Sequence, residues 1–153
     1  MEIKILSREM AIKRIPEKPE LMIGILDSKN YRNNPNNFPI TNPLNNLRIN
    51  YLSYILDDIE EPFQDFVLIT RETAKQILED FAEHKDKIES LAVHCRAGLS
   101  RSPAVAAALN DCFFLGNSPE EFFSGGYTPN RTVYRTICRT AKELGICTED
   151  FLR

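Results

Sequence analysis

The stretch SLAVHCRAGLSRSPAVAAALNDCFFLG, residues 90–116, decides the fold class of this chain. It begins with an apolar run of strand length, SLAVHC (90–95), and ends with a segment that is apolar nearly all round, from Pro103 to Gly116. Such a segment is typical of a buried helix with a proline in its first turn and a glycine at its end. A short loop of small and cationic residues joins the two. The order of strand, tight loop and buried helix predicts an α/β fold.

Outward from this stretch, the periodicity of the apolar residues predicts further elements. Strands are expected at residues 2–6, 21–26 and 47–56, and helices at 8–15, 69–87, 118–123 and 129–145. Because strands and helices are interleaved before a final run of helices, we expect a central, mostly parallel sheet flanked by helices. The length of 153 residues favours a single domain that spans residues 1–153.

Residues 27–47, DSKNYRNNPNNFPITNPLNNL, carry eight asparagines and three prolines and are predicted to form a long, turn-rich loop. A loop of this length is either functional or merely a mobile connection. Its composition, dominated by asparagine and proline, favours the second interpretation.

Charge and composition narrow the function classes. A net charge of −3 predicts no broad attraction to nucleic acid or to an anionic membrane, so any anion binding must be local. The sequence shows neither a signal-like apolar segment at its start nor a run that could span a bilayer. We therefore expect a cytoplasmic protein with free thiols at its four cysteines, Cys95, Cys112, Cys138 and Cys147. The sequence does not indicate an oligomeric state.

The loop after the strand combines the features of a phosphate site. Ligands of open α/β sheets bind at the carboxyl ends of strands, and a helix N-terminus there offers unpaired N–H groups and partial positive charge. Ala97 and Gly98 allow successive N–H groups to point inward, and Arg101 supplies a planar fork for two phosphate oxygens. Cys95, at the centre, has neighbours that favour the thiolate, which is a good nucleophile.

The residues around the cysteine have expected roles as well. Ser102 is placed to hydrogen-bond the sulfur and ease its departure, whereas His94 is expected to fix the loop rather than act as a base. The side chain of Arg96 either contacts substrate or lies solvated at the rim. The phosphate-binding backbone is expected to comprise Arg96, Ala97, Gly98, Leu99, Ser100 and Arg101.

The spacing His-Cys-x5-Arg-Ser in HCRAGLSRS (94–102) resembles the signature of the cysteine-dependent protein tyrosine phosphatase superfamily, and most of all its dual-specificity branch. GGYTPNRTVYR (125–135) is similar to the segment that follows the loop in that branch, so the resemblance covers roughly 47–145. It implies a protein tyrosine phosphatase-like fold and hydrolysis of phosphotyrosine through a phosphocysteine intermediate on Cys95, without metal or cofactor. Phosphoserine and phosphothreonine are further substrates if the pocket is shallow. The implied partner is a phosphorylated protein or a small phosphoester.

The resemblance also implies an aspartic acid that protonates the leaving oxygen and then accepts a proton from water. The candidates are Asp57, Asp58 and Asp65, in or just after the acidic segment DDIEEP (57–62). Asp58 is favoured because it emerges close behind the predicted strand 47–56, at the same sheet edge as the loop. Asp57, Asp65 and the absence of an acid stay open.

Two other functions fit parts of this pattern. A phosphotyrosine-binding pseudophosphatase usually lacks the cysteine, the arginine or the acid; Cys95 and Arg101 are present, so only the acid leaves this alternative open. A phosphatase of non-protein phosphate esters is the other alternative, although the loop lacks the lysines that polyanionic head-group pockets tend to carry. A disulfide between Cys95 and Cys112 that protects the nucleophile is also conceivable.

Overall fold

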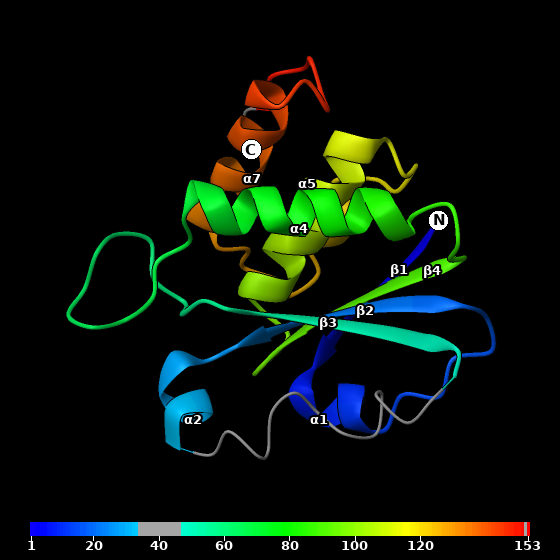
Figure 1. Ribbon diagram of the computed structural model, residues 1–153, viewed down its shortest axis with the longest axis horizontal. Helices are drawn as coiled ribbons and strands as arrows, with labels where there is room; N and C mark the ends of the chain where they lie inside the picture. Colours follow the sequence, from blue (N-terminus) through cyan, green and yellow to red (C-terminus); the bar gives the residue numbers. More distant parts are fainter. Residues whose placement is uncertain (34–46, 152) are drawn as a thin grey trace.

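The computed structural model describes residues 1–33, 47–151 and 153, which form one α/β domain (Figure 1). Its four strands are β1 (Glu2–Ser7), β2 (Glu20–Leu26), β3 (Ile49–Ile55) and β4 (Ser90–Cys95). Its helices are α1 (Arg8–Ile12), α2 (Ser28–Asn33), α4 (Arg71–His84), α5 (Arg101–Phe113), α6 (Glu120–Phe123) and α7 (Arg131–Glu143). The predicted fold class, an α/β domain with a central sheet, is confirmed.

The sheet has the strand order β1-β4-β2-β3 and is parallel throughout, where the sequence predicted a mostly parallel sheet. Every residue of β2 and β4 is buried, as expected for central strands that are covered on both faces. In the register, Ser7 pairs with Cys95, and Gly24 with His94. The carboxyl ends of the strands therefore lie along one edge, which is where ligands bind in such sheets.

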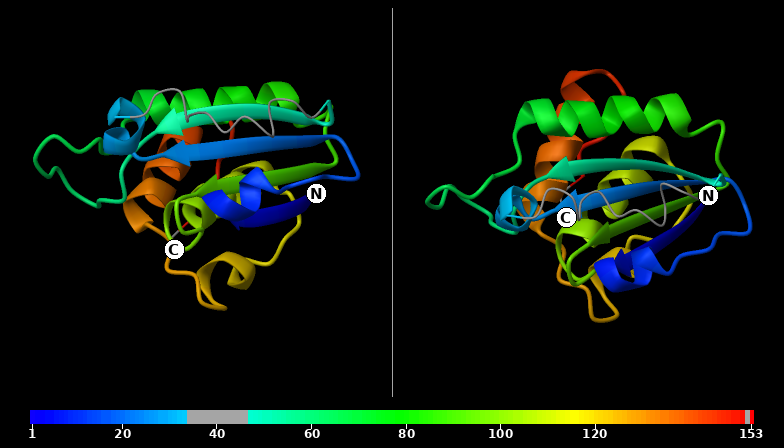
Figure 2. Two further views of the ribbon diagram at one scale, coloured as in Figure 1. Left: turned by 90° about the horizontal axis from the view of Figure 1, so that it is seen from below. Right: turned by 60° about the horizontal axis from the view of Figure 1, so that its bottom comes forward.

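Helices cover the sheet on both faces. α4, α5 and α7 lie together on one face, and α1 lies against the other (Figures 1 and 2). The alternation of side chains along β2 matches this arrangement, because Leu21, Ile23 and Ile25 enter the large core while Met22 enters a smaller core with Ala11 of α1. None of the helices within residues 1–33 and 47–151 is long and apolar enough to span a membrane.

Helix α5 is the buried helix that the sequence predicted, and each of its residues from Arg101 to Cys112 is buried. It ends earlier than predicted: Phe114, with φ 54°, adopts the left-handed conformation, so Gly116 is not its last residue. The cause is Asn110, whose side chain accepts from the amide of Asn117 at 3.0 Å and donates to its carbonyl at 2.9 Å. These contacts turn the chain back after the helix.

The prediction of an unbroken loop over residues 27–47 was wrong at its start, since Ser28–Asn33 form α2. A distant carboxylate supports this helix: Asp57 accepts from the backbone N–H of Ser28 at 3.0 Å and from its hydroxyl at 2.6 Å. Such capping satisfies orphan donors at a helix start and cannot be read from the local composition. Positions 34–46 of the predicted loop lie outside the described residues.

Candidate active site

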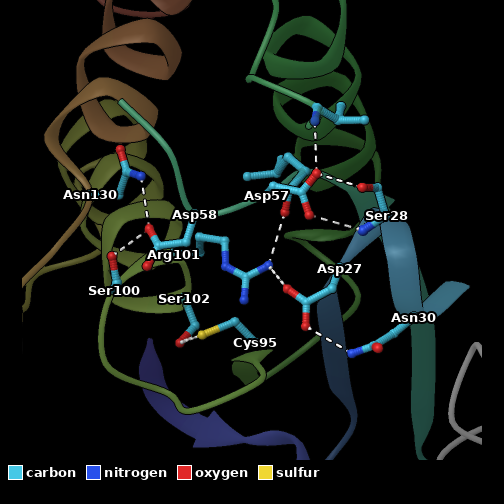
Figure 3. A network of polar contacts seen from close by, with 12 residues as sticks. Asp27, Ser28, Asn30, Asp57, Asp58, Cys95, Ser100, Arg101, Ser102 and Asn130 are labelled. Atoms are coloured by element: carbon cyan, nitrogen blue, oxygen red, sulfur yellow. Dashed lines mark hydrogen bonds and ion pairs between the residues drawn. The ribbon is translucent and has the colours of Figure 1, made fainter. Parts of the chain in front are cut away.

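Cys95 ends β4 at the carboxyl edge of the sheet, and its side chain lies at the bottom of the following loop, only 2% exposed. The backbone N–H of Gly98 donates to its sulfur at 3.3 Å, and the hydroxyl of Ser102 lies 3.2 Å from it. Donors aimed at sulfur stabilise a thiolate relative to a thiol. Gly98 and Ser102 are thus brought together at the sulfur, and Figure 3 shows Ser102 beside it.

The loop can curl so tightly because of Gly98. Its φ is 74°, and a Cβ placed there would lie 2.8 Å from the backbone of Leu6 and Ser7 at the end of β1. Glycine is therefore required twice, for its conformation and for the close approach of two backbones. Along this loop Arg96, Ala97 and Leu99 are exposed, and Ser100 is partly buried.

Arg101, the first residue of α5, is 5% exposed and is anchored on one side. Its Nη1 lies 2.6 Å from Oδ1 of Asp27 and donates to the carbonyl oxygen of Leu56 at 2.9 Å (Figure 3). Its Nε is buried and has no hydrogen-bond partner within the described part of the chain. A buried donor without a partner is costly, and a phosphate oxygen would satisfy it.

The adjacent carboxylates Asp57 and Asp58 have different surroundings. Asp57 is buried and accepts from Ser28 and, at 2.7 Å, from the N–H of Val67. Burial alone would raise the pKa of Asp57, but the hydrogen bonds from Ser28 and Val67 and the charge of Arg101 outweigh it and lower the pKa. Asp57 is therefore a carboxylate that stays ionised and holds structure.

Asp58 is exposed and lies at the rim of the loop. Its Oδ1 accepts from the hydroxyl of Ser100 at 2.8 Å and from the side-chain amide of Asn130 at 2.9 Å (Figure 3). Asp65, the third sequence-derived candidate, is exposed and forms an ion pair with Arg32 at 3.6 Å. Of the three, Asp58 is the one that is hydrogen-bonded to the loop itself.

His94 is buried directly before the cysteine. Its Nε2 lies 2.9 Å from the hydroxyl of Tyr51, and the two rings stack. Burial, with the charges of Arg8 and Arg101 acting in the same direction, lowers the pKa of His94 to about 4. The imidazole is thus neutral near pH 7.

A groove of about 380 Å³ runs beside the loop. Its walls include Phe63 and Phe66, whose ring centroids lie 5.7 Å apart, and Lys29, whose Nζ lies 4.5 Å above the ring of Phe66. Asp58 and Arg96 also line it, so the groove leads directly to the rim of the loop. Asp27, Asp57 and Asp58 contribute negative charge to its lining, and Lys29 and Arg96 contribute positive charge.

The four cysteines are free thiols. Cys112 lies near the far end of α5, about 16 Å along the helix axis from Arg101. Its sulfur is 3.8 Å from that of Cys138 in α7. Cys112 is therefore not positioned to form the protective disulfide with Cys95 that the sequence left conceivable.

Three residues of the polar network around the loop, Asp27, Ser28 and Asn130, were not identified from the sequence. Neither were Tyr51 beside His94 or the groove residues Lys29, Phe63 and Phe66. Asp27 follows the buried run of β2 and so could have been placed at the same sheet edge as the loop. Asn130 precedes the last helix, where asparagine is a typical cap, but a cap carries no indication of a further contact. No signal in the sequence links Ser28 with Asp57.

The fold and this geometry were compared with known proteins. No family model and no curated protein matches the sequence. Among solved structures the chain is similar to PTPMT1, with a TM-score of 0.57 and 15% identity over 94% of this chain and 92% of that one. For PTPMT1 in complex with PI(5)P the TM-score is 0.54, with 13% identity over 94% and 92%. For Tk-PTP in its active form it is 0.54, with 13% identity over 92% and 90%.

These solved structures are of protein tyrosine phosphatases, and the alignments span nearly the whole chain. The chain therefore has the α/β fold of the protein tyrosine phosphatases, as the loop signature implied. At these identities the likeness establishes the fold alone.

Proposed function

We propose that this chain is a phosphatase that hydrolyses phosphate monoesters, phosphotyrosine first among them, through a phosphocysteine intermediate on Cys95. The observation that carries the proposal is the buried sulfur of Cys95, which faces the Gly98 N–H and the Ser102 hydroxyl. Arg101 stands at the end of the same loop with an unpartnered Nε among the described residues. A nucleophile surrounded by donors for a bound anion is the arrangement that phosphoryl transfer needs.

In the first step, the thiolate of Cys95 attacks phosphorus while the bond from phosphorus to the ester oxygen breaks. Asp58, in its protonated form, transfers its proton to that leaving oxygen. Arg101 and the N–H groups of residues 96–101 bind the equatorial oxygens, whose charge is spread in the transition state. The products of this step are the free alcohol or phenol and a phosphocysteine.

In the second step, Asp58 accepts a proton from water as the water oxygen attacks phosphorus. The bond between sulfur and phosphorus breaks, inorganic phosphate leaves, and Cys95 returns as the thiolate. Ser102, 3.2 Å from the sulfur, stabilises the departing thiolate. Asp58 ends the cycle protonated, so protons and charge balance without a metal ion.

Phosphotyrosine is favoured as the substrate because of the groove beside the loop. The rings of Phe63 and Phe66 line it together with Asp58, so an aryl group has apolar contacts where its ester oxygen would meet the acid. A phosphoinositide is the second candidate. Lys29 and Arg96 line the same groove, and PTPMT1, a structure of the same fold, has been solved with PI(5)P.

The test is hydrolysis of p-nitrophenyl phosphate by the reduced wild type and by Cys95→Ser, both with EDTA present. Cys138→Ser, which alters a buried thiol in α7, is the matched control. Activity that withstands the chelator, persists in Cys138→Ser and vanishes in Cys95→Ser supports the proposal. Folded wild type without activity would refute it and leave the phosphotyrosine-binding module, which a phosphopeptide titration then examines. Phosphotyrosine peptides and PI(5)P, compared by kcat/KM, separate the two substrate classes.

A further inference from the structure

Asn130 connects three segments that meet at the rim of the loop. It is 3% exposed and lies directly before α7. Its backbone N–H donates to the carbonyl of Ser100 at 3.0 Å, and its Oδ1 accepts from the N–H of Val133 at 3.1 Å as the cap of α7. Its Nδ2 donates to Oδ1 of Asp58 at 2.9 Å and to the carbonyl of Ile59 at 3.0 Å. One residue thus joins the cysteine loop, the helix and the segment that carries Asp58.

The segment that carries Asp58 needs such support, because residues 56–70 contain no helix or strand. Asn130 fixes this segment at two points, the carboxylate of Asp58 and the following carbonyl. Both described contacts of the carboxylate, from Asn130 and from Ser100, go to the same oxygen, Oδ1. Within the described residues Oδ2 accepts no hydrogen bond, so it is the oxygen that can carry a proton to a leaving group.

The chemistry of an amide suits this position. A lysine or arginine would hold Asp58 but would also keep it ionised, which prevents it from donating a proton. An amide donates a hydrogen bond without adding charge, and its oxygen caps the helix at the same time. Aspartic acid would keep the cap but lose the donor, and serine has no second group to offer. The two hydrogen-bonding tasks together therefore explain why asparagine stands here.

From these contacts we infer that Asn130 is a positioning residue for catalysis: it holds Oδ1 of Asp58 so that Oδ2 is presented to the ester oxygen of the substrate. This inference rests on the proposed phosphatase function. According to this inference, Asn130 caps α7 and also affects the step in which Asp58 protonates the leaving oxygen.

The two roles separate in experiments that vary the leaving group. Phenol leaves from phosphate only with a proton, whereas p-nitrophenol is a far better leaving group and depends less on the acid. In Asn130→Asp the helix cap is retained while the donor to Asp58 is replaced by a second carboxylate. The losses are compared in kcat/KM, which reports the steps up to formation of the phosphocysteine, because hydrolysis of that intermediate is common to both esters and also uses Asp58. We expect kcat/KM for phenyl phosphate to fall at least tenfold in this variant, and kcat/KM for p-nitrophenyl phosphate to fall threefold or less. The thermal midpoint should stay within a few degrees of the wild type.

A mutant cycle gives the second measurement, with Asp58→Asn, Asn130→Ala and the double variant assayed on phenyl phosphate. If Asn130 acts through Asp58, the double variant should be no slower than Asp58→Asn alone. Equal losses on both esters, or losses that multiply in the double variant, would overturn the inference and leave Asn130 as a helix cap. Wild type that hydrolyses neither ester would instead refute the proposed function, and the inference with it.

Discussion

The guanidinium of Arg101 is anchored through Nη1, which contacts Asp27 and the carbonyl of Leu56. A guanidinium offers its donors in a rigid, planar fork, so fixing one nitrogen fixes the orientation of all of them. In the proposed mechanism, the edge that contains Nε binds the phosphate. There Asp27 would act at a distance from the reacting atoms, by setting the plane of the guanidinium.

Replacing Asp27 by alanine should show whether Asp27 affects the orientation of the Arg101 guanidinium or the affinity of the site for phosphate. Without its partner the guanidinium can rotate, and we expect kcat for p-nitrophenyl phosphate to fall about tenfold, the loss of one charge-assisted hydrogen bond. Removing a negative charge beside the site should not weaken anion binding, so the inhibition constant of inorganic phosphate should stay equal or decrease. Steady-state kinetics with phosphate as inhibitor measures both values.

Asp65→Ala is the control for this change, because Asp65 is an exposed carboxylate whose ion pair is with Arg32 rather than Arg101. It should leave both constants unchanged. Weaker phosphate inhibition in Asp27→Ala with an unchanged kcat would contradict the positioning role.

Ser102→Ala should slow hydrolysis of the phosphocysteine more than its formation, so that the two steps can be measured separately. The hydroxyl of Ser102 is fully buried and lies 3.2 Å from the sulfur. In the proposed mechanism it helps the thiolate to leave in the second step and contributes little when the thiolate attacks in the first. We expect hydrolysis of the phosphocysteine to slow about tenfold or more, so that p-nitrophenol appears as a burst of one equivalent per site. Stopped-flow absorbance measures the burst. Ser100→Ala, which changes a hydroxyl bonded to Asp58 instead, should show none.

At this scale the sequence brings the residues of the loop together within one short segment, whereas it favoured Asp58 but left open which carboxylate meets the loop. Cys95, Gly98, Arg101 and Ser102 lie within eight positions, so the local pattern contains their geometry. Whether Asp57 or Asp58 meets the loop depends on partners far along the chain. Asp57 is held by Ser28, 29 positions away, and Asp58 by Asn130, 72 positions away. No periodicity in the intervening residues encodes those contacts.

At the scale of elements, the site is built where β4, its loop and α5 meet the end of β1. Periodicity identified the strands and the long helices because burial on one or both faces leaves a clear apolar pattern. It missed α2, which is polar and short and depends on the carboxylate of Asp57. It also overextended α5, since the side chain of Asn110 ends that helix through contacts with Asn117. The pattern of apolar residues could therefore not predict an element or a helix end that depends on a few polar contacts.

The junction of the loop with β1 can be tested at Gly98. Alanine there would have an unfavourable positive φ and a Cβ 2.8 Å from the backbone of Leu6 and Ser7, which cannot move without disturbing the sheet. We expect the free energy of unfolding to fall by about 3 kcal/mol or more, the sum of backbone strain and overpacking. Activity should fall at least a hundredfold because the hydrogen bond from the N–H of residue 98 to the sulfur of Cys95 is displaced.

Gly116→Ala is the matched control for that change. Gly116 also has a positive φ, 89°, but a Cβ there meets nothing within 4 Å. Its loss should be limited to the conformational cost of about 1 kcal/mol, with activity retained. Chemical denaturation and p-nitrophenyl phosphate assays compare the two variants, and equal losses would show that close packing against β1 does not matter.

At the scale of the whole molecule, the carboxyl edge of the parallel sheet carries several buried ionisable groups, while Glu20 and Asp111 are buried away from it. His94 and Arg101 are buried there together with Asp57. Burial at this edge, with the charges of Arg8 and Arg101 acting in the same direction, lowers the pKa of His94, so its imidazole remains neutral near pH 7. The carboxyl edge of the sheet therefore carries buried charges that make stability depend on pH.

The pH dependence has a definite direction and window. The pKa of His94 is lowered from 6.5 to about 4 in the folded chain, so between these pH values unfolding takes up a proton that the folded state does not bind. Stability is therefore complete above pH 6.5 and falls as the pH decreases towards 4, by at most about 3 kcal/mol in total. The pKa of Asp57 is lowered from 3.8, so its contribution to stability is lost only below that pH. The pH range in which Asp57 affects stability is therefore distinct from that of His94.

Urea denaturation of wild type and His94→Gln at half-unit steps from pH 8 to pH 4 measures the difference that His94 makes. The wild type should lose stability relative to the variant as the pH falls below 6.5, and Asp57→Asn should leave that part of the curve unchanged. The imidazole signals of His94 in NMR spectra of the wild type provide a direct reading, since they should not titrate above pH 5. A difference between wild type and His94→Gln that is constant with pH, together with imidazole titration near pH 6.5, would mean that His94 is not held neutral by its burial at this edge.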